Sequence, residues 1–314
     1  MPAFADDLDV ASLRTSLERS RPPSPAARRL LELLDATPDG AGRGAAIARA
    51  FRVVRVRDPL LLTAYFEPEL AGSLAADDRF RFPLYARPPD LIDVDPRALD
   101  PTCTCRRLAG RTGGTVLEPY PSRAEIEAGA LAGRGLEIAW TDDPVSLSVL
   151  HVQGSGRLVL ADGRRLGVRY AGTNGRRFRS LAHVLVARGL LDPEQASLPA
   201  VRRILASLPA PERAALLAAN DRYTFFRLAE GGPVGSAGVE LTPGRSVATD
   251  PRLVPMGSIG YLVTPSMRRF VVSQDTGVAI VGAHADLFLG SGPEAEAAAG
   301  RMRERGTLYL LQAR

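Results

Sequence analysis

Residues 269–290 read RFVVSQDTGVAIVGAHADLFLG and place two aspartates, Asp275 and Asp286, eleven residues apart. Both lie in segments that are too apolar and too rich in glycine to be an ordinary solvated surface. Residues 270–273 are a β-branched and aromatic run that predicts a buried strand, and the Thr-Gly pair after Asp275 supplies a turn. We therefore expect the two carboxylates at the ends of neighbouring elements, in a setting typical of side chains that carry out chemistry.

The rest of the chain predicts blocks of helix and blocks of strand in succession. The periodicity predicts helices at 28–34 and 44–51, a buried strand at 60–66, a β-rich block at 147–170, helices at 178–188, 198–207 and 212–219, and strands within 239–272. This order argues against a doubly wound parallel sheet, in which strands and helices alternate one by one. It favours an α+β fold with closed, barrel-like sheets.

Several local signals refine this prediction. Ser122 and Glu125 match a capping box that opens a short helix, and the Asp162-Gly163 pair is typical of a hairpin turn. Within the β-rich block we expect a strand at 149–153 that pairs with another at 157–160. Near the C-terminus we expect an alanine-rich helix that begins at Pro293 and ends at Gly306, followed by a last strand at 307–311.

Length and composition limit the class of protein. With 314 residues, the chain can bury a large core and form two domains, or one large domain with an insertion. Its 45% hydrophobic and 24% charged residues are ordinary for a globular protein. The net charge of +5 comes entirely from arginine, because the chain has no lysine. The arginines are scattered among acidic residues, so we expect no nucleic-acid partner, whereas a polyanionic cell-wall surface would suit the mild positive charge.

Metal sites and membrane spans are not indicated. Cys103 and Cys105 are one residue apart, a spacing that strains a disulfide and supplies too few ligands for zinc, and we interpret both as incidental. The three histidines lack any paired spacing, so we expect no catalytic metal. No apolar run is long enough to span a bilayer, and the N-terminus lacks the pattern of a secretion signal. These features fit either a cytoplasmic protein or a mature chain.

Three further motifs each allow a functional and a purely structural interpretation. The turn formed by Gln153, Gly154, Ser155 and the next glycine lacks the lysine of a phosphate-binding loop, and could instead line a sugar-binding groove or be a simple tight turn. The Asp-Thr-Gly at Asp275 resembles the loop of aspartic proteases, which need two copies where this chain has one. Asp250 lies at the junction of a strand and a turn, where capping the turn is its expected role.

Seven segments, in order along the chain, together resemble the membrane-bound lytic murein transglycosylase A family. They are TAYFEPEL (63–70), RAEIEAGAL (123–131), DPVSLSVLHVQGSGR (143–157), YAGTNG (170–175), YTFFR (223–227), LTPGRSVATDPRLVPMG (241–257) and QDTGVAIVGAHADLFLG (274–290). The last two resemble a C-terminal "3D" region named for three aspartates, which here are Asp250, Asp275 and Asp286. Ala64 departs from the pattern, because the family commonly has glycine there.

The resemblance implies a mainly β fold with two domains. A double-psi β-barrel from residues 1–68 and 222–314 would be catalytic, residues 69–221 would form an inserted second β-barrel domain, and a groove between the two would hold the glycan. The implied substrate is peptidoglycan, cleaved between MurNAc and GlcNAc, in the periplasm or cell envelope. No cofactor is implied, and we expect a monomer.

The resemblance also implies roles for particular residues. Asp286 would be the catalytic acid, with Asp275 and Asp250 as supporting acids. Candidates for holding the sugar are Thr63, Tyr65, Gln153, Gly154, Ser155 and Asn174. A free Asp titrates near ~3.9, so burial must raise the pKa of Asp286 before it can donate a proton near neutral pH.

Two other functions remain open from the sequence. One is a hydrolytic endoglycosidase on the same type of barrel, with Asp275 as base and Asp286 as acid. The other is a cell-wall glycan-binding protein without catalytic activity.

Overall fold

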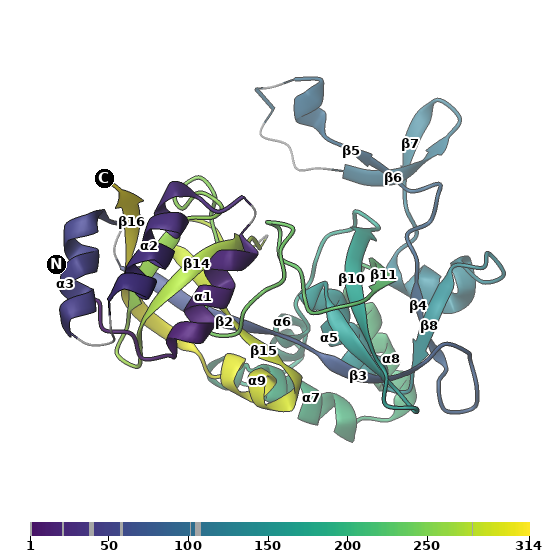
Figure 1. Ribbon diagram of the computed structural model, residues 1–314. Helices are drawn as coiled ribbons and strands as arrows, with labels where there is room; N and C mark the ends of the chain where they lie inside the picture. Colours follow the sequence, from purple (N-terminus) through teal and green to yellow (C-terminus); the bar gives the residue numbers. More distant parts are fainter. Residues whose placement is uncertain are drawn as a thin grey trace. The chain divides into compact units, whose positions relative to one another are not determined.

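The structure, a computed structural model, describes residues 2–20, 22–37, 41–56, 59–100, 102–103, 108–277 and 279–314 (Figure 1). The chain divides into two compact units. The first combines Met1–Glu67 with Gly231–Arg314, and the second is Pro68–Glu230. The assignment of a catalytic domain and an inserted domain to particular residues stays a prediction.

The first unit is built on a sheet that closes on itself. Its strands, in spatial order, are β1 (Phe51–Arg55), β16 (Arg303–Ala313), β13 (Ile259–Val263), β14 (Arg268–Asp275), β12 (Ser246–Thr249), β15 (His284–Ser291) and β2 (Leu60–Glu67). The long strand β16 pairs with β13 along its second half and with β2 along its first half, which closes a ring of six strands. The pairings of β12 with β14 and of β15 with β2 are parallel. This ring, assembled from both ends of the chain, confirms the predicted barrel.

Apolar side chains from all six strands of the ring fill the barrel. On β15, Ala285 and Leu287 are buried in this cluster together with Leu62 of β2 and Val247 of β12. Successive side chains of a strand point to opposite faces of the sheet. The polar residues of β15 that alternate with the buried ones therefore lie on the outer face of the barrel.

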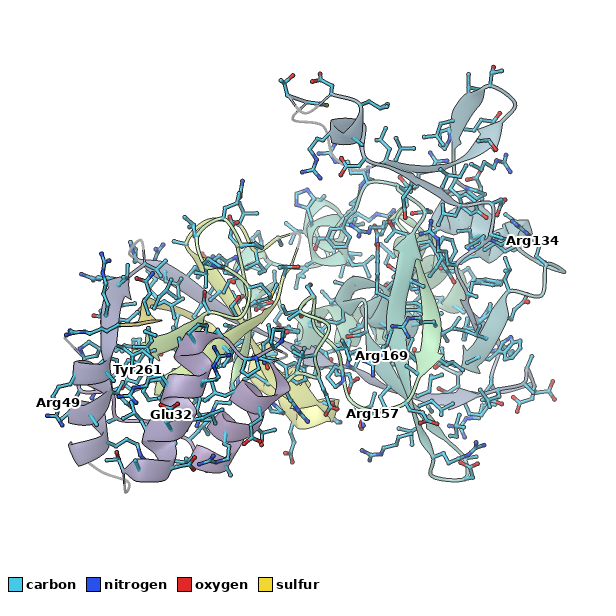
Figure 2. The ribbon with its side chains drawn as sticks, turned by 45° about the horizontal axis from the view of Figure 1, so that its top comes forward. Glu32, Arg49, Arg134, Arg157, Arg169 and Tyr261 are labelled. Carbon is cyan, nitrogen blue, oxygen red and sulfur yellow. The ribbon has the colours of Figure 1, made fainter. Side chains whose placement is uncertain are left out.

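Helices α1 (Val10–Arg19), α2 (Pro25–Ala36) and α3 (Ala41–Ala50) pack on the outside of β13 and β14. Their buried leucines, such as Leu17 and Leu30, share a core with Tyr261 and Phe270. The rings of Tyr261 and Phe270 are 4.9 Å apart between centroids, and Tyr261 lies among these helices in Figure 2. The amphipathic N-terminal segment thus covers one side of the barrel.

Helix α9 (Gly292–Ala299) lies against β2 and β15. It ends well before Gly306, so the predicted end of this helix is wrong. The residues from Arg303 onward instead begin β16, where Arg303 pairs with Thr63. The alanine-rich stretch is helical and ends at Gly300, and the following residues are drawn into the barrel by pairing with β2.

The second unit contains its own curved sheet. Its strands, in spatial order, are β11 (Thr224–Ala229), β10 (Arg165–Thr173), β9 (Gly156–Leu160), β3 (Glu69–Ser73), β8 (Glu137–Thr141) and β4 (Phe82–Tyr85). A bridge from Ala86 to Phe226 joins the chain just after β4 to β11, so the two edges of this sheet meet as in a barrel. A small separate sheet consists of β5 (Ile92–Val94), β6 (Leu108–Gly113) and β7 (Val116–Pro119).

The helices of the second unit are α4 (Arg123–Glu125), α5 (Pro144–Gln153), α6 (Leu181–Ala187), α7 (Leu198–Ser207) and α8 (Ala210–Ala218). The predicted capping box is confirmed at the start of α4, where Ser122 and Glu125 cap each other's backbone N–H. The predicted hairpin turn between β9 and β10 is also confirmed, by the hydrogen bond from the N–H of Gly163 to the carbonyl of Leu160.

Cys103 is disulfide-bonded, whereas Cys105 lies outside the described residues.

The strand predicted at 149–153 is wrong, because these residues form the second half of α5. Asp143 caps the helix by accepting hydrogen bonds from two backbone N–H groups, Pro144 occupies its first turn, and Gly154 ends it at φ 78°. The helix is buried on most of its surface, so its apolar residues show no helical period. A short, mostly apolar segment of this kind cannot be distinguished from a buried strand by periodicity alone.

Candidate active site

The outer face of β2 and β15 carries the polar residues predicted to be catalytic. In the parallel pairing of these strands, Thr63 is opposite Asp286. The hydroxyl of Thr63 donates a hydrogen bond of 2.6 Å to Oδ1 of Asp286 and lies 2.9 Å from Nε2 of His284. Because His284 and Asp286 are two residues apart on one strand, their side chains share this face. The backbone thus assembles a row of three polar groups.

Strand β12 lies between β14, which carries Asp275, and β15, which carries Asp286, and the register places the two acids at the same level of the sheet. Ala248 pairs with Asp286 on one side and with Asp275 on the other. The ten residues between the two aspartates therefore connect β14 to β15, which is two strands away in the sheet. The sequence predicted both acids at the ends of neighbouring elements. Asp275 does end β14, but Asp286 is the third residue of β15, and β12 lies between the two strands.

Asp275 is held by four hydrogen bonds. Its Oδ2 accepts from the hydroxyl of Tyr65 at 2.8 Å. Its Oδ1 accepts from the N–H and the hydroxyl of Ser236, both at 2.9 Å, and from the N–H of Thr276 at 2.8 Å. Burial, together with the negative charges of Asp275 and Asp286, raises the pKa of Tyr65 well above its usual value. Tyr65 therefore remains a neutral hydrogen-bond donor.

Asp286 differs from Asp275 in its surroundings. Its side chain is half-buried, and within the described residues its only hydrogen-bond donor is Thr63. Burial raises the pKa of Asp286 above the ordinary value, and the charge of Asp275 adds to the increase, whereas the bond from Thr63 and the charge of His284 oppose it. The net effect makes Asp286 a weaker acid than a free aspartate, which shifts it toward the protonated form that can give up a proton to a leaving group.

Asp250, the third predicted acid, is an anchor for the backbone. Its carboxylate accepts from the side chain of Arg252 and from the N–H of Gly282 at 2.8 Å, and these bonds hold its pKa well below the usual range. Gly282 lies two residues before His284, where β15 begins. Asp250 thus fixes the turn that leads to His284 and Asp286, in addition to the expected role of capping its own turn, where Oδ1 accepts from the N–H of Arg252.

The raised pKa of Asp286 predicts a cost to stability at neutral pH. A carboxyl whose pKa is higher in the folded state than in the unfolded chain loses stability as pH rises through the folded value. Asparagine cannot ionise, so we expect Asp286→Asn to melt at a higher temperature than the parent near pH 7. The difference should disappear below the ordinary pKa of 3.8. Thermal melts followed by circular dichroism at both pH values test this, and a variant less stable at neutral pH would contradict it.

The remaining candidates for sugar contacts lie in the second unit. Gln153 ends α5, Gly154 is its left-handed C-cap, and Ser155 leads into β9, all of them half-buried. Their role in binding stays a prediction.

Asn174 is different, because it is fully buried and bonded only to backbone. Its amide donates to the carbonyls of Pro121 and Asp221, and its carbonyl accepts from the N–H of Tyr223 and of Arg176. All four hydrogen-bonding positions of this side chain are used, so the structure gives Asn174 a role in holding three segments of its own unit together. No group of Asn174 is left for a sugar.

The sequence analysis missed three residues of the site. Ser236 and Thr276 bind Asp275, and His284 binds Thr63. His284 carried a usable signal, because a polar residue two positions before Asp286 shares its face on a strand. Ser236 carried none, since only the tertiary structure brings residues 39 positions apart together.

Two domain families match the chain. Residues 61–227 match the MltA specific insert domain, and residues 245–312 match the 3D domain. The first match alone covers more than half of the chain. The chain belongs to the MltA family.

Named relatives and solved structures of the MltA family agree with this assignment. The membrane-bound lytic murein transglycosylase A of Vibrio cholerae is 32% identical over 266 residues, which are 80% of this chain and 65% of that protein. MltA from Neisseria gonorrhoeae, in a monoclinic crystal form, has a TM-score of 0.84 at 28% identity and covers 100% of this chain and 90% of its own. A membrane-bound lytic murein transglycosylase from Agrobacterium tumefaciens has a TM-score of 0.79 at 33% identity, covering 97% of this chain and 91% of its own. The predicted family and fold class are confirmed.

Among the described residues, no group of histidine, cysteine, aspartate and glutamate side chains is arranged to hold a metal ion. The helices in the described part of the chain are also too short or too polar to cross a bilayer.

Proposed function

We propose that this chain cleaves the β-1,4 bond between MurNAc and GlcNAc in peptidoglycan without water, and leaves a 1,6-anhydromuramoyl end. The proposal rests on the family membership and on one observation, the half-buried Asp286 whose pKa is raised by burial. Two of the relatives named above, from Vibrio cholerae and Agrobacterium tumefaciens, are murein transglycosylases described as membrane-bound. We propose a periplasmic site of action and a monomeric enzyme on the same basis.

In the first step, Asp286 donates its proton to the glycosidic oxygen as the bond from that oxygen to C1 of MurNAc breaks. An oxocarbenium-like centre then develops at C1, and the carboxylate left on Asp286 lies close to it. In the second step, the C6 hydroxyl of the same sugar attacks C1 and gives its proton to Asp286. The acid is thereby restored, and no water is consumed.

One free carboxylate is sufficient for this sequence of steps. A hydrolase needs a second one to activate water or to attack C1. Asp275 is poorly suited to that task, because its oxygens already accept four hydrogen bonds. Intramolecular attack needs no such base, since a well-placed internal hydroxyl reaches an effective concentration of ~10⁵ M or more. We propose that Asp275 instead orients Tyr65 and stabilises positive charge at C1.

The mass of the product is the experiment that tests the reaction. Purified sacculi digested by the protein are expected to release muropeptides with 1,6-anhydro ends, each one water lighter than the product of hydrolysis. Digestion in heavy-oxygen water should leave their masses unchanged. A free reducing end that carries the heavy oxygen would establish a hydrolase, and binding to sacculi without any release would establish a glycan-binding protein.

The residues that contact the sugar are a further part of the proposal. Thr63 and Tyr65 lie beside the two acids on β2, and Gln153, Gly154 and Ser155 form the turn after α5. We propose that these five groups position the glycan.

A further inference from the structure

We propose that His284 is a positioning residue for Asp286, acting through the hydroxyl of Thr63, and that this chain keeps the acid proton on Oδ2. The inference deepens the proposed function and rests on it. It starts from two distances, 2.9 Å between His284 Nε2 and Thr63 Oγ1, and 2.6 Å between Thr63 Oγ1 and Asp286 Oδ1.

The three residues are held in place by the sheet. Thr63 and Asp286 are paired across β2 and β15, and His284 precedes Asp286 by two residues on β15. Both strands bury alternate residues in the apolar barrel, for example Leu62 and Ala285. A shift of either strand by one residue would move the polar side chains into the apolar core. The strand register that aligns the three hydrogen-bonded side chains is therefore strongly determined.

Counting protons gives the direction of each bond. A threonine hydroxyl has a single proton and can donate only one hydrogen bond. When Asp286 is ionised, Thr63 donates this proton to Oδ1, because a carboxylate can only accept. Nε2 of His284 must then carry a proton and donate it to Thr63.

The same count decides where Asp286 takes up a proton. A proton on Oδ1 would point at the oxygen of Thr63, so Thr63 would have to turn its own hydroxyl proton toward His284. The proton on Nε2 of His284 already points in the opposite direction along that contact, so two protons would face each other. If the proton goes to Oδ2, every bond of the chain stays as it is. Within the described residues Oδ2 accepts no hydrogen bond, so it is the oxygen available to the substrate. One oxygen of Asp286 then both gives the proton in the first step and takes it back in the second.

The neighbouring titratable groups do not offer an alternative partner. Asp275 already accepts four hydrogen bonds, and the hydroxyl of Tyr65 is committed to Asp275. Asp250 is engaged with Arg252 and with the backbone of Gly282. Among the described groups close to Asp286, the bond from Thr63 to Oδ1 is therefore the one that can orient its carboxyl.

The test compares a residue at position 284 that can donate a hydrogen bond with one that cannot. His284→Phe removes the donor. We expect kcat on soluble uncross-linked glycan strands to fall about tenfold with KM nearly unchanged, because an oriented hydrogen bond that positions a charged group is lost. His284→Gln supplies an amide N–H near the position of Nε2 and should restore most of the rate. Equal losses in both variants, or a loss confined to KM, would overturn the inference.

A double-mutant cycle checks that His284 acts through Thr63. Thr63→Val removes the hydroxyl at constant volume, and the double variant with His284→Phe should be no slower than Thr63→Val alone. Additive losses would show that His284 acts independently and would overturn the proposal. If phenylalanine prevents folding, as thermal melts would reveal, His284→Ala takes its place in the cycle. A parent protein that forms no 1,6-anhydro product would contradict the proposed function instead, so the two failures are distinguishable.

Discussion

Replacing Asp286 with asparagine is expected to slow the release of 1,6-anhydromuropeptides by a factor of ~10²–10⁴, the usual contribution of a positioned general acid. Asparagine keeps the shape of the side chain and can still accept the bond from Thr63, but it has no proton to donate to a leaving oxygen. The measurement is the rate at which the variant and the parent release these products from purified sacculi, determined by liquid chromatography and mass spectrometry.

Binding to sacculi provides the control for this variant. The amide preserves the outer face of β2 and β15, so we expect cosedimentation with sacculi to remain close to that of the parent. Asp275→Asn is the matched comparison, since this residue has an orienting role in the proposed mechanism and should cost less than Asp286→Asn. A loss of tenfold or less in Asp286→Asn would count against Asp286 as the acid.

The second large effect is expected on stability, at a buried ion pair in the first unit. Arg245 is 0% exposed and Asp6 is 14% exposed, and they are joined by bonds of 3.0 and 2.8 Å from Nη1. Arg245 also donates to the hydroxyl of Ser12 and to the carbonyls of Asp9 and Phe270. Breaking a buried pair from one side leaves an uncompensated charge and typically costs about 3–5 kcal/mol. We expect Arg245→Met to lower the free energy of unfolding by this amount.

Urea denaturation followed by circular dichroism measures this loss. The double variant Asp6→Asn with Arg245→Met removes the charge that would be left alone, and should recover part of the stability. The matched control is Arg29→Met, whose partner Glu32 is 63% exposed while Arg29 is 51% exposed, so its effect should stay within about 0.5 kcal/mol. Equal losses in the free energy of unfolding for Arg245→Met and Arg29→Met would mean that the ion pair of Arg245 and Asp6 does not stabilise the packing of the N-terminal segment on the barrel.

Much of the fold could be predicted from the sequence because its signals are local. The leucine stripes of α2 and α7, the capping box at Ser122 and the hairpin glycine at 163 each depend on residues within a few positions of one another. The errors occurred where distant residues decide the outcome. Most of α5 is buried by its own unit, so its apolar residues show no helical period, and α9 stops early because β2 pairs with the start of β16.

The sequence by itself determined that Asp275 and Asp286 lie in apolar, glycine-rich segments, and the resemblance carried by its motifs implied which of them would be the acid. Only the tertiary structure distinguished their environments. Asp275 accepts hydrogen bonds from Tyr65, Ser236 and Thr276, whereas among the described residues the half-buried Asp286 accepts one, from the hydroxyl of Thr63. The physical reason is that the pKa of a carboxyl depends on its burial and on its hydrogen-bond donors, and strand pairing brings these together from distant parts of the chain.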